Sequence, residues 1–281
     1  MDGCAAMVDA EKVARDPYER FAFGKNWQRY LARAGDREIA AAKSSLAVAL
    51  DGLDTHAATF LDIGSGSGLF SRAAVEIGFA RVVSFDYDAD SVAATRALHG
   101  AAGAPLNWSV RQGSVLDPAL LRELGQFDMV YAWGVLHHTG AMWQAVGNAA
   151  DAVAPNGRLF IALYNDQGWI SHYWRLIKRL YVRSPRFMQR LLTGLFSAYF
   201  ATVLGLADLV RLRNPAVRYQ GDKRGMKFVY DVVDWIGGYP FEVARPDTVI
   251  EYLQSRGFAL HWARRVGRRH GCNEFVFERM R

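Results

Sequence analysis

Short apolar runs alternate with amphipathic segments along most of the chain. Seven of these runs have the length of strands: 59–63, 81–85, 107–110, 127–134, 157–165, 258–265 and 273–279. Between the first five, and again at 246–256, apolar residues recur at the intervals typical of helices. Strands that alternate with helices pair in parallel through right-handed crossovers. The pattern therefore predicts a doubly wound α/β sheet.

Helical patterns also precede and interrupt this alternation. Residues 11–50 are expected to form helices ahead of the first strand, and there Phe23, Trp27 and Tyr30 can cover a cofactor, although such a stripe more often serves packing. After the fifth strand the alternation stops for some seventy residues, as in a lid over a binding site. The predicted parts are an N-terminal helical cap at 1–58, a cofactor-binding core at 59–166, a helical lid at 167–240 and a C-terminal completion of the sheet at 241–281.

One stretch of the predicted lid, Leu191–Ala207, contains no charged residue. Its length lies at the lower limit for a helix that spans a bilayer, and it is interrupted by Gly194, Ser197, Thr202 and Gly205. We therefore expect no transmembrane segment. The alternatives are a buried lid helix, a helix between two subunits of a homodimer, or a helix lying in a membrane interface beside the basic residues that precede it.

The first strand runs into the sequence FLDIGSGSGLFS, residues 60–71. Its three glycines predict a tight turn at which backbone N–H groups approach a ligand, because glycine has no Cβ. The dinucleotide fingerprint G-x-G-x-x-G would need its third glycine at Leu69, so a dehydrogenase is not favoured. Asp62, just before the turn, would repel a pyrophosphate but can attract an ammonium group. A nucleotide-like cofactor with an amino-acid end is therefore predicted.

The second strand ends at Asp86, about 20 residues beyond the glycines, which is the interval expected of a carboxylate that binds a ribose. Asp86 can accept hydrogen bonds from both ribose hydroxyls, and Tyr87 can lie against an adenine. An ordinary solvated strand end is the alternative. The interval between turn and acid favours the ligand site.

The fourth and fifth strands bring polar side chains to the same edge of the predicted sheet. Trp133, His137 and His138 follow the fourth strand, and Tyr164 and Asn165 end the fifth. Ligands of open parallel sheets lie outside the carboxyl ends of the strands, and a neutral imidazole is the commonest base near pH 7. We expect His137 or His138 to act as the base while Tyr164 and Asn165 orient the substrate. Packing at the start of the next helix is the alternative role of the histidines.

The acid with its glycine turn, the acid ending the second strand, the Gly113–Ser114 corner and the sequence WGVLHH resemble class I S-adenosylmethionine-dependent methyltransferases in their order. The resemblance spans 59–166 and 246–281. It implies a Rossmann-like, seven-stranded, mostly parallel sheet with an antiparallel last strand, S-adenosylmethionine as cofactor and S-adenosylhomocysteine as product. The family's usual adenine-binding acid is Ser114 here, whose hydroxyl can also accept that bond. The expected cofactor-binding residues are Asp62, Gly64, Ser65, Gly66, Gly68, Asp86, Tyr87, Ser114, Val115 and Trp133.

The sequence VLHHTG resembles the branch that contains quinone-biosynthesis methylases and other small-molecule methyltransferases. This implies methyl transfer to an O, N or C atom of a small, partly apolar acceptor. No N/D-P-P-Y/F sequence follows the fourth strand and no Pro-Cys nucleophile occurs, so no nucleic-acid substrate is expected. An RNA- or protein-directed enzyme that docks through its basic lid is the alternative. Polar candidates for holding an acceptor in the lid are Arg224, Asp231, Asp234 and Tyr239.

Charge and cysteine content add little to this picture. The formal net charge is +6, and basic residues gather at 175–190, 211–227 and 264–269, where a solvated face is the default and an anionic partner the alternative. Cys4 and Cys272 lie far apart without metal-ligand spacing, so no metal site is expected and a reducing compartment is favoured. The first residues carry acids where a secretory signal needs an apolar run, which predicts a cytoplasmic protein.

Overall fold

The computed structural model describes residue 24 and residues 35–210, 212, 214, 228–267 and 271–280. The predicted roles of Phe23, Trp27, Tyr30 and Arg224 fall outside these residues, as do the side chains of Asp231 and Asp234. The division of the chain into four parts stays a prediction.

The centre of the molecule is one seven-stranded sheet with the order β3-β2-β1-β4-β5-β7-β6. The strands are β1 (Thr59–Ile63), β2 (Arg81–Asp86), β3 (Trp108–Gln112), β4 (Phe127–Trp133), β5 (Val153–Tyr164), β6 (Phe258–Arg264) and β7 (Cys272–Arg279). Strands β1 to β5 pair in parallel, whereas β7 runs antiparallel to both β5 and β6. The predicted doubly wound sheet with an antiparallel last strand is confirmed.

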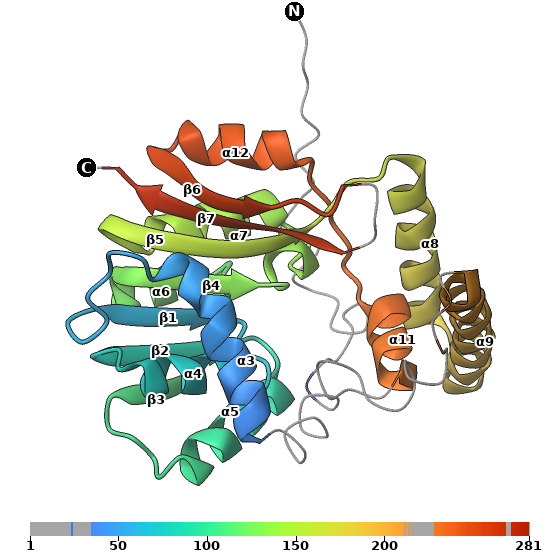
Figure 1. Cartoon of the computed structure of the whole chain (residues 1–281), viewed down its shortest axis with the longest axis horizontal. Coiled ribbons are helices and arrows are strands. Elements are labelled where there is room, and N and C mark those ends of the chain that lie inside the picture. Colours follow the sequence, from blue (N-terminus) through green and yellow to red (C-terminus); the bar gives the residue numbers. More distant parts are fainter. Residues whose placement is uncertain are drawn as a thin grey trace, which may run out of the picture.

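Helices cover both faces of this sheet (Figure 1). One face carries α3 (Asp36–Leu46), α4 (Leu69–Ile77) and α5 (Ala89–Ala101); the other carries α6 (Pro118–Leu124), α7 (Met142–Asp151) and α12 (Pro246–Gln254). The inner strands β1, β2, β4, β5 and β7 are mostly buried on both faces, which explains why they are continuous apolar runs, whereas the edge strands β3 and β6 are largely exposed. Crossovers of this kind bring the carboxyl ends of β1, β2, β4 and β5 to one edge.

Two acids, Asp88 and Asp90, lie at the start of α5. The N-cap is Asp88, whose carboxylate accepts a hydrogen bond from the Asp90 backbone N–H at 2.8 Å. The second oxygen of Asp88 accepts the backbone N–H of Gly24 at 3.0 Å. Both acids can cap a helix. Asp88 is the cap because it still has an extended backbone and the helix begins at the next residue.

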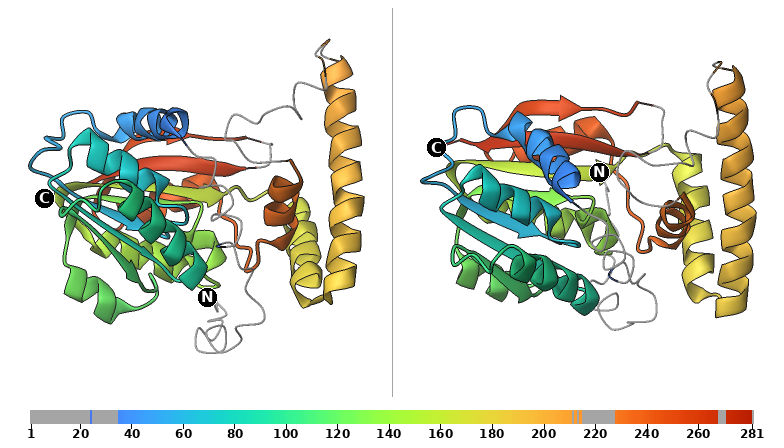
Figure 2. Two further views of the ribbon diagram at one scale, coloured as in Figure 1. Left: turned by 90° about the horizontal axis from the view of Figure 1, so that it is seen from below. Right: turned by 60° about the horizontal axis from the view of Figure 1, so that its bottom comes forward.

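The described part of the insertion after β5 contains the helices α8 (Trp169–Arg183), α9 (Arg186–Val210) and α11 (Phe228–Gly237). They stand beyond the sheet edge, with α9 outermost and α8 and α11 between it and the strands (Figure 2). An apolar cluster that includes Trp174, Tyr181, Ile236 and Phe241 joins α8 and α11 to Tyr164 at the end of β5. The insertion is thus packed on the edge where the candidate site residues lie.

Candidate functional site

The glycine turn between β1 and α4 is held against the end of β2. The backbone N–H groups of Gly64 and Ser65 both donate to the Phe85 carbonyl, at 2.8 and 3.1 Å. Gly64 has φ +70°, and a Cβ there would lie 2.5 Å from a methyl group of Val135. Gly68 has φ +79°, and a Cβ at this position would likewise come too close to Thr95. Only glycine fits these two positions, because they combine a left-handed backbone with close packing.

Asp86 lies directly beside this turn. One carboxylate oxygen accepts the Gly66 N–H at 2.9 Å and the other accepts the Asp88 N–H at 2.9 Å. Burial raises the pKa of Asp86 to about 6, although these backbone bonds oppose the shift. Tyr87, the next residue, has half its side chain exposed. The structure therefore brings the predicted ribose-binding acid, the predicted adenine neighbour and the glycine turn together.

Asp62 occupies an interior position behind the turn, with 2% of its surface exposed. Its carboxylate accepts the Ser71 hydroxyl, and Ser71 is also hydrogen-bonded to Ser84, which accepts the Trp108 indole N–H. Burial raises the pKa of Asp62 to about 7. This chain of hydrogen bonds ties β1 to α4 and β2, so the carboxylate contacts Ser71 rather than the surface. Its predicted contact with an ammonium group stays a prediction.

The side chains of the remaining predicted cofactor residues make contacts within the protein. The Ser65 hydroxyl is hydrogen-bonded to Thr95 at 3.0 Å, and the Ser114 hydroxyl accepts the Leu116 backbone N–H at 3.1 Å. Val115 is buried in the core. Trp133 donates its indole N–H to Glu274 of β7 at 3.0 Å, on the α3–α4 face of the sheet.

A compact ring cluster forms where β4 and β5 end. The His137 ring lies 4.0 Å from the Tyr164 ring and 4.4 Å from the His138 ring, and His138 lies 5.5 Å from Tyr164, all between centroids. His138 Nδ1 is 2.7 Å from the Pro240 carbonyl, which can only accept, so Nδ1 carries the proton. Three of the four predicted catalytic side chains are thus in contact.

Both histidines are uncharged at neutral pH. Burial lowers the pKa of His138 to about 3, assisted by the positive charge of Lys178. Burial also lowers the pKa of His137 well below its usual value, although a backbone contact with Ala162 opposes the shift, and neither ring nitrogen reaches a partner at good hydrogen-bond geometry within the described part of the chain. A base with so low a pKa takes a proton weakly, because efficient general bases have pKa values near the working pH. The environment favours hydrogen-bond acceptance over full protonation.

Comparison with known proteins bears on this edge of the sheet. Residues 61–159 match the methyltransferase domain family. The magnesium protoporphyrin IX methyltransferase of Synechocystis, solved with S-adenosylhomocysteine, shares the fold with a TM-score of 0.55 at 13% identity, over 96% of this chain and 99% of that one. The chain carries a class I S-adenosylmethionine-dependent methyltransferase domain.

Curated relatives match parts of this chain. The ubiquinone biosynthesis O-methyltransferase of Rhodopseudomonas palustris is 30% identical over 122 residues, 43% of this chain and 46% of that protein. The ribosomal protein L11 methyltransferase of Pectobacterium carotovorum is 43% identical over 47 residues, 17% of this chain and 16% of that protein. The chain matches less than half the length of these relatives, so the similarity identifies the domain.

The methyltransferase domain fits its family's cofactor at the observed positions. Each Asp86 oxygen keeps acceptor capacity beyond the backbone bonds described above, since a carboxylate offers about four lone-pair sites. The glycine turn presents backbone without side chains next to that acid, and half-exposed Tyr87 adds an apolar ring. Among the described residues, no group of three or more metal-binding side chains occurs.

Lys178 of α8 is a part of the site that sequence reasoning missed. It is fully buried, donates to the Trp235 carbonyl, and its ammonium lies 4.6 Å from the Trp235 ring, 4.8 Å from that of Phe241 and 5.8 Å from that of Tyr164. A usable signal exists in the sequence: Lys178 occupies the otherwise apolar, buried face of α8 with Trp174 and Tyr181. A lysine on such a face must find aromatic or polar partners.

Glu242 is a second residue that sequence reasoning missed. Its carboxylate accepts the Met142 backbone N–H at 3.1 and 3.2 Å, at the start of α7, and its own backbone N–H donates to the His137 carbonyl at 3.0 Å. Burial raises the pKa of this carboxyl. The segment after α11 therefore fixes the histidine turn, and no local pattern near His137 indicates so distant a partner.

Asn165, by contrast, lies apart from the ring cluster. Its amide nitrogen donates to the Gly267 carbonyl at 2.6 Å, and its amide oxygen accepts from Asn273 at 2.9 Å. Both polar atoms thus hold the turn between β6 and β7. This position favours a structural role, and its predicted role in orienting an acceptor stays a prediction.

Proposed function

We propose that this protein is a cytoplasmic enzyme that transfers the methyl group of S-adenosylmethionine to an O, N or C atom of a small, partly apolar acceptor. The observation that carries the proposal is the placement of two groups at one sheet edge. The Asp86 carboxylate beside the glycine turn provides a nucleoside site, and the uncharged His137–His138–Tyr164 cluster provides an acceptor site. The methyltransferase match and the named small-molecule O-methyltransferase relative support this assignment.

On the cofactor side, the chain contributes orientation. Asp86 would accept hydrogen bonds from the ribose hydroxyls, because its carboxylate is already fixed by the Gly66 and Asp88 N–H groups. Tyr87 would lie along the adenine, and Ser114 would accept a hydrogen bond from its amino group. When bound, S-adenosylmethionine supplies an activated methyl group. Alignment of two reactants in a closed site can supply several kcal/mol of the barrier, on the order of 7 for well-oriented pairs.

On the acceptor side, the chain contributes an apolar wall and one weak base. Trp174, Trp235 and Phe241 exclude water from the Tyr164 side of the site. The Nδ1–H of His138 is directed to Pro240, which leaves Nε2 as the ring's acceptor atom. There Nε2 would accept a hydrogen bond from an acceptor hydroxyl while the hydroxyl oxygen bonds the methyl carbon and the carbon–sulfur bond breaks. S-adenosylhomocysteine would leave, and the hydroxyl proton would pass by way of Nε2 to solvent without being held on the ring. This arrangement suits an acceptor that is itself weakly acidic, such as a phenol.

Calorimetry with S-adenosylhomocysteine tests the cofactor half of the proposal. Asp86→Ala should weaken binding about 10- to 100-fold, because hydrogen bonds to a charged group contribute about 1.5 to 3 kcal/mol. Asp117→Ala removes an exposed helix-capping acid of the same charge and should leave binding unchanged. Equal affinity in Asp86→Ala, or tighter binding of a nicotinamide dinucleotide by the parent protein, would contradict the proposal.

A screen with methyl-labelled S-adenosylmethionine tests the acceptor half. Label should enter an organic-soluble fraction of a small-molecule extract rather than RNA or protein. The RNA- or protein-directed alternative predicts the reverse, together with a steep loss of binding as salt rises. The RNA- or protein-directed alternative is less favoured because the insertion side chains that pack around Tyr164 are mostly aromatic rather than basic.

A further inference from the structure

The helix α9 exposes a long apolar stripe to solvent. Of its 25 residues, only Asp208 is fully buried. Leu195 is 59% exposed and Val210 85%, and every member of the stripe is at least 44% exposed. The stripe consists of Phe187, Leu191, Leu195, Tyr199, Val203, Leu206, Leu209 and Val210. Steps of mainly four and three residues place these side chains on one side of the helix.

The neighbouring helix α8 also exposes apolar side chains. Tyr173, Leu176 and Leu180 of α8 are each about half exposed or more, while Trp174 and Tyr181 on the opposite side of α8 are buried. Because α9 is the outermost element of the molecule in both views of Figure 2, no described segment covers its outer side. Soluble monomers rarely leave so large a contiguous apolar patch uncovered, and such patches mark interaction surfaces.

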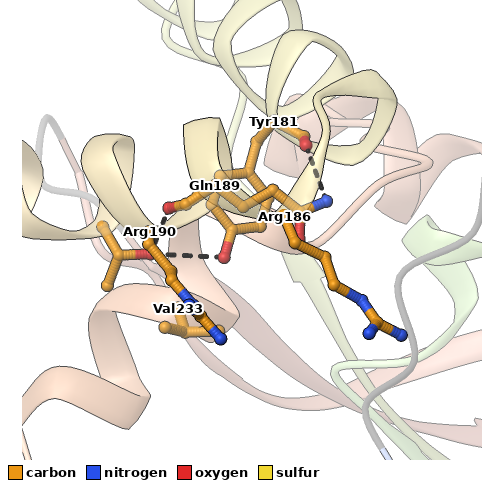
Figure 3. A pocket seen from close by; sticks show the side chains of 6 residues that line it. Tyr181, Arg186, Gln189, Arg190 and Val233 are labelled. Atoms are coloured by element: carbon orange, nitrogen blue, oxygen red, sulfur yellow. Dashed lines mark hydrogen bonds between the residues drawn. The ribbon is translucent and has the colours of Figure 1, made fainter.

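The corner between α8 and α9 carries positive charge at the N-terminal end of this stripe, on the side of α9 that also carries Gln189 and Thr193. Arg186 and Arg190 project from the first turns of α9 next to an open depression of about 410 Å³, lined also by Tyr181, Gln189, Thr193 and Val233 (Figure 3). Within the described part of the chain, neither arginine is joined to an acid by an ion pair. The corner is therefore a basic site with polar hydrogen-bonding groups around it.

The charge balance indicates what covers the stripe. Residues 169–210 contain six lysines and arginines and a single acid, the buried Asp208. The sequence that follows, 211–227, contains six more basic residues and one acid. A second copy packed on the stripe in parallel would oppose Arg186 and Arg190 with the same two arginines, and basic residues also follow the stripe in the sequence. An anionic surface has the complementary charge.

Length alone would allow α9 to cross a membrane, but its inner side is not apolar throughout. Leu192, Phe196 and Phe200 pack against the α8–α11 cluster, while Gln189, Thr193 and Asp208 add polar groups to that side. A spanning helix needs lipid-compatible groups on its whole circumference unless other spanning elements surround it. The helix has the two-sided character of one that lies in the interface plane.

We propose that the outer surface of α9, with the adjoining side of α8, docks this protein on an anionic phospholipid membrane. The stripe lies at the boundary of headgroups and acyl chains. Arg186 and Arg190 reach lipid phosphates from its basic end, as long basic side chains do at membrane interfaces. The proposal concerns binding alone and does not depend on the methyl-transfer reaction.

Vesicle flotation with the full chain tests it. The vesicles are phosphatidylcholine alone, or roughly two parts phosphatidylcholine to one part phosphatidylglycerol. The protein should float with the mixed vesicles and much less with the neutral ones. Arg186→Gln with Arg190→Gln should weaken that binding about 10- to 30-fold, since each arginine near an anionic surface contributes about 1 kcal/mol. Arg96→Gln with Arg122→Gln removes the same charge from exposed positions on α5 and α6 and should bind as the parent.

The stripe has its own matched variants. Leu191→Gln with Leu195→Gln should abolish flotation, whereas Leu106→Gln, at a fully exposed position in the loop before β3, should not change it. Unchanged melting temperature and S-adenosylhomocysteine binding establish that the variants are folded. Flotation equal for the parent and all four variants, or equal with both vesicle types, would overturn the proposal. So would a dimer in sedimentation analysis that the stripe variant dissociates while no vesicle binds.

Discussion

The pKa of Asp86 makes nucleoside binding depend on pH in a defined way. Burial raises this pKa to about 6 in the ligand-free protein, and ribose hydroxyls need the ionised carboxylate as acceptor. The ionised fraction falls from about nine-tenths at pH 7 to about one-tenth at pH 5 for such a group. Affinity for the ribose should therefore fall about tenfold between these two pH values.

Stability of the ligand-free protein should change in the opposite direction. Because the folded pKa of Asp86 is raised above its unfolded value, protonation of this group stabilises the fold. That contribution is present at low pH and is lost as pH rises through about 6. As pH rises through this range, nucleoside binding thus becomes stronger while the ionised Asp86 carboxylate lowers the stability of the ligand-free protein.

Adenosine is the sharpest ligand for this test, because it has the ribose but lacks the amino-acid end. Asp62, whose pKa is raised to about 7, lies behind the turn and titrates in a nearby range, so ligands with an ammonium group would report both acids. Calorimetry with adenosine from pH 5 to pH 7 isolates Asp86. Asp86→Asn should bind adenosine weakly and without pH dependence. Parent affinity that stays constant, or a pH dependence that survives in the variant, would refute the reasoning.

Two further substitutions separate turn and acceptor roles. Gly64→Ala should destabilise the protein by about 1 to 3 kcal/mol, because its Cβ meets Val135 and its φ is positive; a melting temperature equal to the parent would contradict this. His138→Asn keeps a donor for the Pro240 carbonyl but removes Nε2, so turnover of a hydroxyl acceptor should fall about 10-fold or more while calorimetry shows unchanged cofactor affinity; full turnover would leave alignment as the whole of catalysis.

Local patterns predicted the parts of the site that are local. The glycine turn lies between a buried strand and a helix, and Asp86 ends the next strand, so parallel pairing alone brings them together. The histidines and Tyr164 likewise follow strands that pair directly. Residues at the carboxyl ends of neighbouring strands can therefore be predicted to lie together without information about distant contacts.

Distant contacts account for what was missed. Pro240 and Glu242 reach the histidine turn from about 100 residues away, and Lys178 arrives on a helix of the insertion. Asn165 lies at the correct edge but is engaged by Gly267 and Asn273, a pairing set by how β6 and β7 fold back. The pKa values of the histidines depend on this enclosure, so a sequence can indicate a base without indicating its strength.

The helix α8 connects the two surfaces for which functions are proposed. Its inner side carries Lys178 against Trp235 and Tyr164, and its outer side carries Leu176 and Leu180 in solvent. A helical period of 3.6 residues allows one segment to serve both, since positions three and four apart share a side while their neighbours face away. Changes to the outer side should therefore alter vesicle binding and leave the enclosure of the histidines intact. A loss of both together in a folded outer-side variant would mean that the insertion works as a single unit, and that membrane docking and acceptor binding are coupled through α8.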